Sequence, residues 1–350
     1  MSQPGPVRPA PGTLATVAPG LLRACMPLPG PPSHVNCWLI ADGEGWLLVD
    51  TGAGDAATRA LWRGIFADSL GGRPLTRVLV THFHPDHVGL AGWICAEWGV
   101  PLLMPRSEWQ RTRLLLTEDE AALAELFIDF QRRAGAGPQH LAWLRQEGFA
   151  YRRTVAPLPR TYEPLAEGDL LQTRGRQWRV RIGAGHSPEM ACLHDEAGGI
   201  LISTDHILPR ISPHIGLQPT EPDADPLGTF IAALESFSRM PAGTHVLPSH
   251  GEPFRDLRGR IATLRQHHET ALTRLAGSLG SGLTASEALP VLFDRTFEGR
   301  QLAFALSEAL AHLSHLRRRG QVQRHGTAEG IWRFETTRPE PRRARWNDGT

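Results

Sequence analysis

The sequence predicts an α/β protein in which helices cover the outer faces of two sheets, followed by a small winged-helix-like domain. Two observations predict this architecture. Up to about residue 252, short apolar runs typical of strands mix with helical segments, without the regular alternation of a single parallel sheet. Beyond that point, three long helical segments and a hairpin follow. The length of 350 residues fits one large and one small domain.

The composition excludes several functions. Apolar residues make up 41% of the chain and charged residues 21%, which is typical of a globular protein with a sizeable core. The net charge of +1 argues against a surface built throughout for nucleic acid or acidic membranes. All 37 cationic residues are arginine, which excludes a Schiff-base lysine and the lysine of a phosphate-binding P-loop. Carboxylates, thiols, hydroxyls and 16 histidines remain available for chemistry.

The sequence also predicts a cytoplasmic protein with no membrane partner. No apolar run approaches the roughly 20 residues that cross a bilayer, and the first residues lack the apolar centre of a secretory signal. The four cysteines lie far apart without a CxxC pair. Neither a disulfide framework nor a zinc ribbon is therefore expected.

The first part of the chain is predicted to be a tail and a larger domain. Residues 1–19, rich in Pro and Gly, are expected to form an irregular tail, and residues 20–255 the larger domain. A Leu-rich helical insertion is predicted within it at about 106–150. The other elements expected in this domain are strands at 35–40, 46–50, 77–80, 178–182, 190–194, 199–204 and 245–248, and helices at 87–98 and 226–239.

Residues 256–337 are expected to form the winged-helix-like C-terminal domain. An amphipathic helix is predicted at 256–277, and Thr284 with Glu287 forms a capping box that begins a second helix. A third helix is predicted at about 301–318, before a β-hairpin around the turn GTAEG. The last residues, 338–350, are expected to be a disordered tail.

The segment THFHPDH at residues 81–87 indicates metal chemistry. It places His82, His84, Asp86 and His87 directly after a predicted buried strand. Imidazole nitrogens and carboxylate oxygens are ligands that Zn²⁺ prefers. In extended chain the first two histidines point the same way, while the last two groups turn towards a neighbouring position. This arrangement suits two metal ions side by side.

Three other strand ends carry residues of the same types. His186 lies in GAGHSP, Asp205 in LISTDH and His250 in LPSHG, and each follows an apolar strand. Asp50, in LLVDTG, follows an earlier strand in the same way. Loops that leave a rigid sheet are where functional side chains gather, so we expect these groups to converge.

This ordered pattern resembles the metallo-β-lactamase-fold hydrolase superfamily over roughly residues 20–252. The resemblance implies a four-layered αβ/βα sandwich with a catalytic site at one edge. It implies one metal ion held by His82, His84 and His186, and a second held by Asp86, His87 and His250, with Asp205 bridging them. It also implies that Asp50 orients a ligand histidine. The cofactor expected is a pair of divalent ions, with Zn²⁺ the expected metal.

The C-terminal part carries a narrower resemblance. A winged-helix-like domain of this length follows the sandwich in the LACTB2-like (β-lactamase-like protein 2) branch, which includes a ribonuclease and many bacterial hydrolases. The motif DHILPRISPHIG at residues 205–216 is also similar to those bacterial members. Neither match fixes a substrate.

The expected activity is hydrolysis of a small-molecule ester, thioester or lactone by a hydroxide that bridges two zinc ions. Asp86 is expected to be the catalytic residue, because it would both ligate an ion and orient the nucleophile. His206, Arg210 and His214, in the turn after the bridging carboxylate, are candidates for substrate binding.

Two alternatives remain open at the level of sequence. One is a metal-dependent phosphodiesterase or endoribonuclease whose C-terminal domain grips RNA through the arginines at 317, 318, 319 and 324. The net charge argues against it, and we favour the interpretation that these arginines complement a helix dipole. The other is a mononuclear iron dioxygenase, which the ligand types alone do not exclude.

Overall fold

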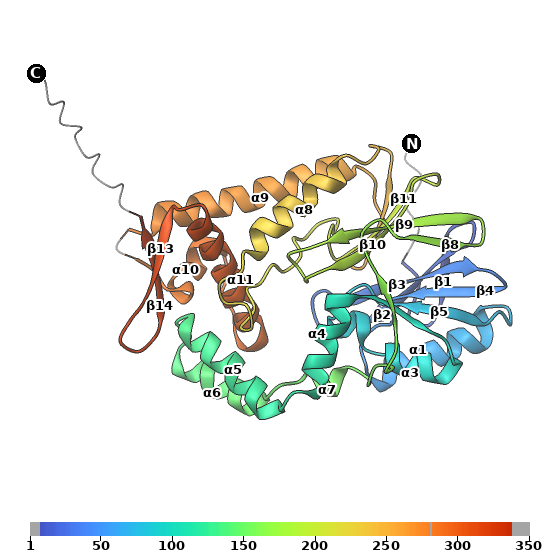
Figure 1. The fold of residues 1–350 in the computed structure, drawn as a ribbon, viewed down its shortest axis with the longest axis horizontal. Coiled ribbons are helices and arrows are strands. Elements are labelled where there is room, and N and C mark those ends of the chain that lie inside the picture. The colour runs from blue at the N-terminus through green and yellow to red at the C-terminus, as the bar shows by residue number, and fades with distance from the viewer. Residues whose placement is uncertain (1–7, 281, 338–350) are drawn as a thin grey trace, which may run out of the picture.

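The computed structural model describes residues 8–280 and 282–337, so the predicted tail at 338–350 lies outside the described residues. A seven-stranded sheet and a five-stranded sheet lie face to face, with helices on their outer sides (Figure 1). The predicted α/β class with helix-covered sheets is confirmed.

The first sheet runs in chain order from β1 to β7. Its strands are β1 (Leu14–Ala18), β2 (Leu21–Pro27), β3 (His34–Asp42), β4 (Gly45–Val49), β5 (Leu75–Leu79), β6 (Leu102–Pro105) and β7 (Glu163–Leu165). Strands β3 and β4 form an antiparallel hairpin, and β4 to β7 are parallel. The prediction of an irregular tail is wrong for β1, because this short edge strand pairs antiparallel with β2 despite its Pro- and Gly-rich surroundings.

The second sheet has the order β12-β11-β10-β9-β8. Its strands are β8 (Leu170–Thr173), β9 (Arg176–Gly183), β10 (Met190–Asp195), β11 (Ile200–Thr204) and β12 (His245–Pro248). The four strands predicted here are confirmed. Trp38 and Leu79 of the first sheet pack with Trp178 and Leu247 of the second in a buried inner core. Removing this apolar surface from water holds the two sheets together.

Helices cover both outer faces. On the first sheet lie α1 (Ala56–Gly64), the π-helix η1 (Ile65–Ser69), α2 (Pro85–Val88) and α3 (Ala91–Trp98); α8 (Pro226–Ser238) lies on the second. The helix predicted at 87–98 is in fact two helices. The carbonyl oxygen of Gly89 accepts a hydrogen bond from the backbone N–H of Ala156, so it does not continue the helical ladder.

The segment predicted to be a helical insertion is helical, and it connects the sandwich to the C-terminal helices. Its helices are α4 (Arg106–Thr117), α5 (Glu120–Arg133), α6 (Pro138–Glu147) and α7 (Tyr151–Thr154). Gln131 donates to the carbonyl of Ala303, and the backbone N–H of Ser286 donates to the carbonyl of Ala134. The insertion therefore contacts the C-terminal part on the side away from α9 (Figure 1).

The C-terminal part contains three helices and a hairpin, as predicted. They are α9 (Leu257–Ser278), α10 (Ala285–Leu292), α11 (Gly299–Arg318), β13 (Val322–Gly326) and β14 (Trp332–Thr336). The capping box of Thr284 and Glu287 is present. Leu264 of α9 and Leu310 of α11 share one buried cluster with Leu234 of α8, so this part packs directly on the sandwich. Its likeness to a winged helix stays a prediction.

Within the described part of the chain, no helix is long and apolar enough to cross a membrane.

A close approach of α3 to the loop before β7 predicts a stability effect. A Cβ atom added at Gly92 would clash with the carbonyl oxygen of Pro157, whereas one added at Gly64, in α1, would meet open space. We expect Gly92→Ala to lower the free energy of unfolding by about 1–3 kcal/mol through overpacking. The matched change Gly64→Ala is expected to raise it by about 0.5–1 kcal/mol, because alanine favours helix. Urea denaturation measures both, and equal effects of the two substitutions would contradict this packing argument.

Candidate metal centre

The seven predicted metal ligands and Asp50 all lie at one edge of the sandwich. The loops after β4, β5, β9, β11 and β12 carry them. Strands β4 and β5 are parallel, as are β11 and β12, so within each pair the carboxyl ends lie at the same edge. The seven predicted ligands gather there as two groups.

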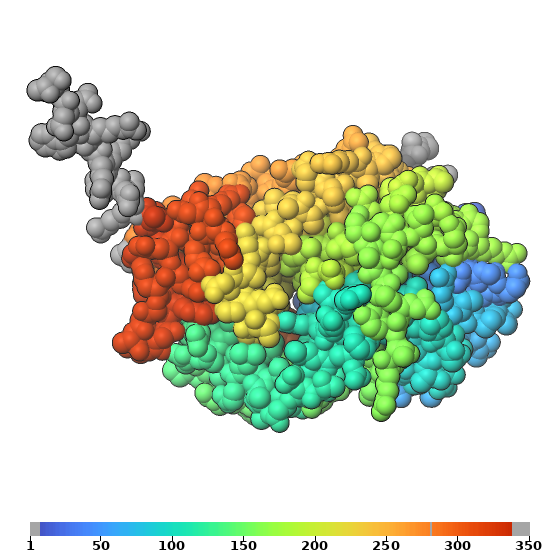
Figure 2. All heavy atoms as spheres, in the orientation of Figure 1, coloured from blue at the N-terminus to red at the C-terminus, as the bar shows by residue number. Residues whose placement is uncertain are grey.

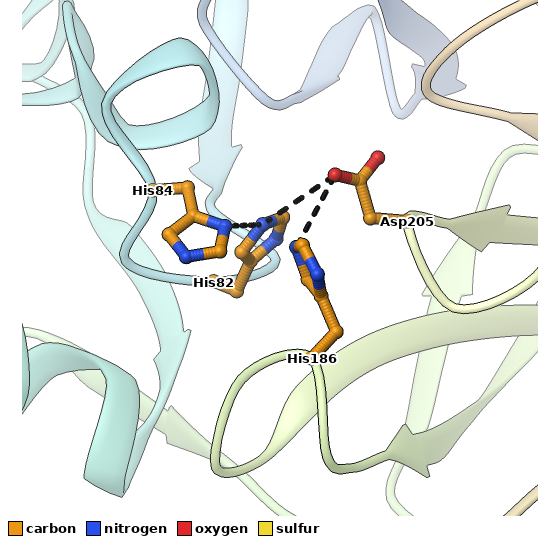
Figure 3. Close-up of side chains that lie close together, drawn as sticks. All are labelled: His82, His84, His186 and Asp205. Carbon is orange, nitrogen blue, oxygen red and sulfur yellow. Dashed lines mark hydrogen bonds and ion pairs between the residues drawn. The ribbon is translucent and has the colours of Figure 1, made fainter. Parts of the chain in front are cut away.

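The first group contains His82, His84, His186 and Asp205, and each offers a ligand atom within 4.8 Å of the others (Figure 3). Nε2 of His82 and Nδ1 of His84 are 3.0 Å apart. Nε2 of His186 lies 3.3 Å from Oδ2 of Asp205. Three imidazoles and one carboxylate thus face a common point, as a tetrahedral divalent ion requires.

The second group contains Asp86, His87 and His250. Oδ2 of Asp86 lies 3.6 Å from Nε2 of His87 and 3.5 Å from Nε2 of His250. Asp205 lies between the two groups, because its Oδ2 lies 3.3 Å from Nε2 of His186 and 3.5 Å from Nε2 of His87, and its Oδ1 lies 3.3 Å from Nε2 of His250. The structure thus brings together the residues that the resemblance assigns to two ions, and that assignment stays a prediction.

Hydrogen bonds to Nδ1 orient three of these imidazoles. Nδ1 of His186 donates to the carbonyl of His214 at 2.7 Å, and Nδ1 of His250 donates to the carbonyl of His34 at 2.7 Å. A carbonyl oxygen only accepts, so Nδ1 carries the proton in both rings. In the neutral ring Nε2 then keeps a free lone pair that points into the cluster.

Asp50 orients the third imidazole. Its Oδ2 lies 2.8 Å from Nδ1 of His87, and its two oxygens also accept the backbone N–H and hydroxyl of Thr81. The hydroxyl of Thr81 is thereby turned so that its oxygen faces Nδ1 of His82 at 3.0 Å. Asp50 therefore orients His87 directly and His82 through the hydroxyl of Thr81.

Several buried atoms of the cluster have no hydrogen-bond partner among the described residues. They are Nε2 of His87, Nε2 of His186 and Oδ1 of Asp205. An unsatisfied buried polar atom costs about 1–3 kcal/mol, and here three of them face one another. Divalent cations bound by the two groups would accept these lone pairs, so the residues present fit a metal site.

The electrostatics of the two groups differ. Burial, and after it the neighbouring imidazoles, hold the pKa of His82 well below its usual value. Burial also opposes the charge of His87, yet the carboxylates of Asp86, Asp50 and Asp205 together raise the pKa of that ring well above its usual value. Because three carboxylates favour positive charge at His87, a metal cation can replace the proton there.

Glu108 of α4 is a residue that sequence reasoning missed. It is fully buried, and its two oxygens accept the backbone N–H groups of Phe83, at 3.0 Å, and Glu189, at 2.6 Å. Phe83 lies between His82 and His84, and Glu189 lies three residues after His186. One carboxylate of the helical insertion thus fastens both ligand loops, a role that no local spacing in the sequence indicates.

The three candidate substrate-binding residues lie in different environments. The ring of His206 is buried between Phe230 and Phe237, which leaves none of it open to a ligand. Arg210 is exposed. The ring of His214 faces α11, with Nε2 3.0 Å from the hydroxyl of Ser307, while its carbonyl holds His186. The structure therefore places His206 in the core and gives His214 a supporting contact with a predicted ligand.

Two family models match the chain. Residues 30–250 match the metallo-beta-lactamase superfamily, and residues 272–337 match the family described as "Metallo-beta-lactamase-like, C-terminal domain". The resemblance inferred from the sequence is confirmed, and the second match is consistent with the LACTB2-like branch.

Two solved structures are similar over nearly the whole chain. A beta-lactamase domain protein from Burkholderia ambifaria is 39% identical, with a TM-score of 0.88, and the match covers 94% of this chain and 96% of that one. A metallo-beta-lactamase family protein from Thermus thermophilus is 30% identical, with a TM-score of 0.79 and coverage of 92% and 100%. The arrangement of both parts of the chain is thus shared with these proteins.

A curated relative has a named activity. The acyl-coenzyme A thioesterase MBLAC2 of Gallus gallus is 28% identical over 177 residues, which are 49% of this chain and 57% of that protein. The chain therefore matches little more than half the length of this relative.

The contact between Asp50 and His87 predicts a selective effect on metal affinity. In Asp50→Asn the amide NH₂ can face Nδ1 of His87, which favours the tautomer with its proton on Nε2 and blocks ligation. Asn tolerates the left-handed backbone at this position (φ 61°), so the fold is retained. We expect metal affinity to fall about 10- to 100-fold, measured by competition with a chromogenic chelator.

The matched control for this substitution is Asp55→Asn. Asp55 caps α1 through the N–H of Thr58, and Asn is an equally good cap. This variant is expected to bind metal like the wild type. Equal affinities for metal in Asp50→Asn and the control would contradict the orienting role of Asp50.

Proposed function

The chain belongs to the metallo-β-lactamase superfamily, and from this premise we propose that it hydrolyses a small-molecule thioester, ester or lactone with two divalent ions, expected to be Zn²⁺. Family membership makes it a metal-dependent hydrolase. The observation that carries the binuclear proposal is the position of Asp205, whose carboxylate lies within 3.5 Å of His186 in one group and of His87 and His250 in the other. A shared carboxylate of this kind suits two adjacent ions rather than one.

The residues of the site would divide the work as follows. His82, His84 and His186 would hold one ion, and Asp86, His87 and His250 the other. When bound, the two ions would lower the pKa of a water molecule towards neutrality and polarise the carbonyl of the substrate.

Asp86 is the side chain we assign to proton handling. It is part-buried, whereas Asp205, the other carboxylate among the predicted ligands, is almost fully buried, so Asp86 is the carboxylate with access to solvent. From that position Oδ2 can accept a proton from the attacking water while its negative charge keeps the water oriented.

Of the three proposed reactions, thioester hydrolysis is the one that the name of a relative also supports. The relative from Gallus gallus carries the name of an acyl-coenzyme A thioesterase. A thioester carbonyl is electrophilic, and its thiolate is a good leaving group. Polarisation of the carbonyl and activation of a water molecule therefore suffice for cleavage.

The contacts of the C-terminal arginines argue against the RNA alternative. Arg317 and Arg324 both bind Oδ1 of Asp223, at 2.7 and 2.8 Å. Arg319 binds both oxygens of Glu269 at 3.1 Å. Since these guanidinium groups already face carboxylates of the same chain, they do not form an unpaired basic stripe of the kind that binds phosphates.

Metal analysis tests the binuclear site directly. We expect purified protein, after dialysis against metal-free buffer, to contain about two divalent ions per chain by elemental analysis. His250→Ala, which removes a ligand of the second group alone, is expected to retain about one. If both proteins contained one ion per chain and that ion were iron, the result would instead support a mononuclear iron dioxygenase.

Asp86→Asn tests the catalytic assignment. The amide is nearly isosteric but neither accepts a proton nor carries charge, so we expect kcat for thioester, ester or lactone hydrolysis to fall at least about 100-fold. Thermal denaturation checks that the fold survives. Full activity in this variant would remove Asp86 from the mechanism.

The same screen separates the two hydrolase proposals. Turnover of a small thioester without RNA binding supports the function proposed here. Cleavage of RNA at a rate that falls steeply with salt concentration would replace it with the nuclease.

A further inference from the structure

A cavity of about 280 Å³ opens beside the metal centre. His186 and Phe83 form the wall nearest the cluster, and Arg111 of α4 lies on the same lining. The opposite wall is the segment from Gly216 to Thr229, which leads into α8. Figure 2 shows a hollow on this face, between the teal surface of the α4 region and the yellow surface of that segment.

Arg111 is the one cationic side chain, other than histidine, among the described residues that line this cavity. Its Nη1 donates to the hydroxyl of Thr220 at 2.7 Å and its Nη2 to the amide oxygen of Gln218 at 3.1 Å. The guanidinium carbon lies 5.5 Å from the centre of the Phe83 ring. These contacts hold the guanidinium across the cavity, next to a loop that carries two predicted metal ligands.

The charge of Arg111 has no ion-pair partner in the described part of the chain. Both of its hydrogen-bond acceptors are neutral, and its Nε is buried without an acceptor. Glu221 and Asp225 also line the cavity, and Glu108 lies one turn before Arg111 on α4. Glu221 and Glu108 favour the charge of Arg111 from a distance, but none of the three forms an ion pair with it. A part-buried guanidinium without an ion-pair partner is costly, and an anion entering the cavity would lower that cost.

We propose that Arg111 binds an anionic group of the substrate, a carboxylate or a phosphate, while the bond to be cleaved lies at the metal centre. This inference rests on the proposed hydrolase function and narrows its substrates to acidic ones. The planar fork of a guanidinium matches a carboxylate or phosphate with two parallel hydrogen bonds. The neutral side chains of Gln218 and Thr220 are acceptors that such an anion can displace.

Glu221 gives the proposal a second, opposite test. Its negative charge on the same lining opposes an incoming anion, whereas Arg111 attracts it. Removing each charge should therefore change the preference for acidic substrates in opposite directions. A role of Arg111 in packing alone would not link these two effects.

The experiment compares pairs of thioesters that differ by one charged group. The acyl arm uses glutaryl and pentanoyl thioesters of N-acetylcysteamine, which differ in a terminal carboxylate. The carrier arm uses pentanoyl thioesters of 4′-phosphopantetheine and of pantetheine, which differ in one phosphate group of the leaving thiol. In each arm the readout is the ratio of kcat/KM for the charged substrate to kcat/KM for the neutral one.

We expect Arg111→Gln to lower this ratio about 10- to 100-fold in one of the two arms, the size of one charge-assisted contact. That arm identifies the source of the anion. Arg111→Lys keeps the charge but not the fork and should recover part of the loss, while Glu221→Gln should raise the ratio. Arg113→Gln removes the same charge from the same helix, outside the cavity lining, and should leave the ratio unchanged.

Binding of glutarate and of inorganic phosphate, measured by calorimetry on the purified full-length chain, separates failure of this inference from failure of the proposed function. The metal centre is the same in wild type, Arg111→Gln and Arg113→Gln, so only the cavity arginine distinguishes them. Weaker binding of either anion in Arg111→Gln alone supports the anion site, even if no thioester is hydrolysed. Equal ratios and equal anion binding in Arg111→Gln and Arg113→Gln would overturn it.

Discussion

The carboxylate of Asp205 is the group on which the rest of the site depends. It is almost fully buried and faces imidazoles of both groups, with 3.3 Å to His186 on one side and to His250 on the other. A buried carboxylate is stable only where positive charge or donors surround it. The loops after β5, β9 and β12 must therefore converge on it, which requires that the two sheets be held in a fixed relative position.

The fold meets this demand with backbone rather than with more ionisable groups. The carbonyl oxygens of His34 and His214 set the tautomers of two histidines, and neither oxygen can lose its role by titration. The Trp- and Leu-rich core between the sheets fixes the distance between the strand ends that supply the ligands. Rigid β-structure and backbone acceptors together orient these lone pairs towards the site, as second contacts to metal ligands do.

The sequence predicted features that depend on neighbours in the chain. Such local patterns can be recognised without knowledge of the fold. They include the cluster at 81–87, the capping box of α10, and the strand ends at His186, Asp205 and His250. Strand β1 was missed because its apolar run is short and its neighbours are Pro and Gly, and the break at Gly89 was missed because its cause is a hydrogen bond to Ala156, far along the chain. The roles of Glu108 and Arg111 are tertiary in the same way, since each acts on a loop distant in sequence.

These tertiary contacts also explain why the C-terminal part is structurally continuous with the catalytic site. Nε2 of His214 faces the hydroxyl of Ser307, on α11, and the carbonyl of Phe304. The carbonyl of His214 in turn accepts a hydrogen bond from Nδ1 of His186. A shift of α11 would therefore change the orientation of a predicted metal ligand through a single intervening residue. Glu108 gives a second connection of this kind. It holds both ligand loops, and its helix α4 belongs to the insertion that contacts the C-terminal helices. The helical parts of the chain thus orient a site whose predicted ligands all come from the sandwich, so changes in those parts can alter the site without any change in the predicted ligands.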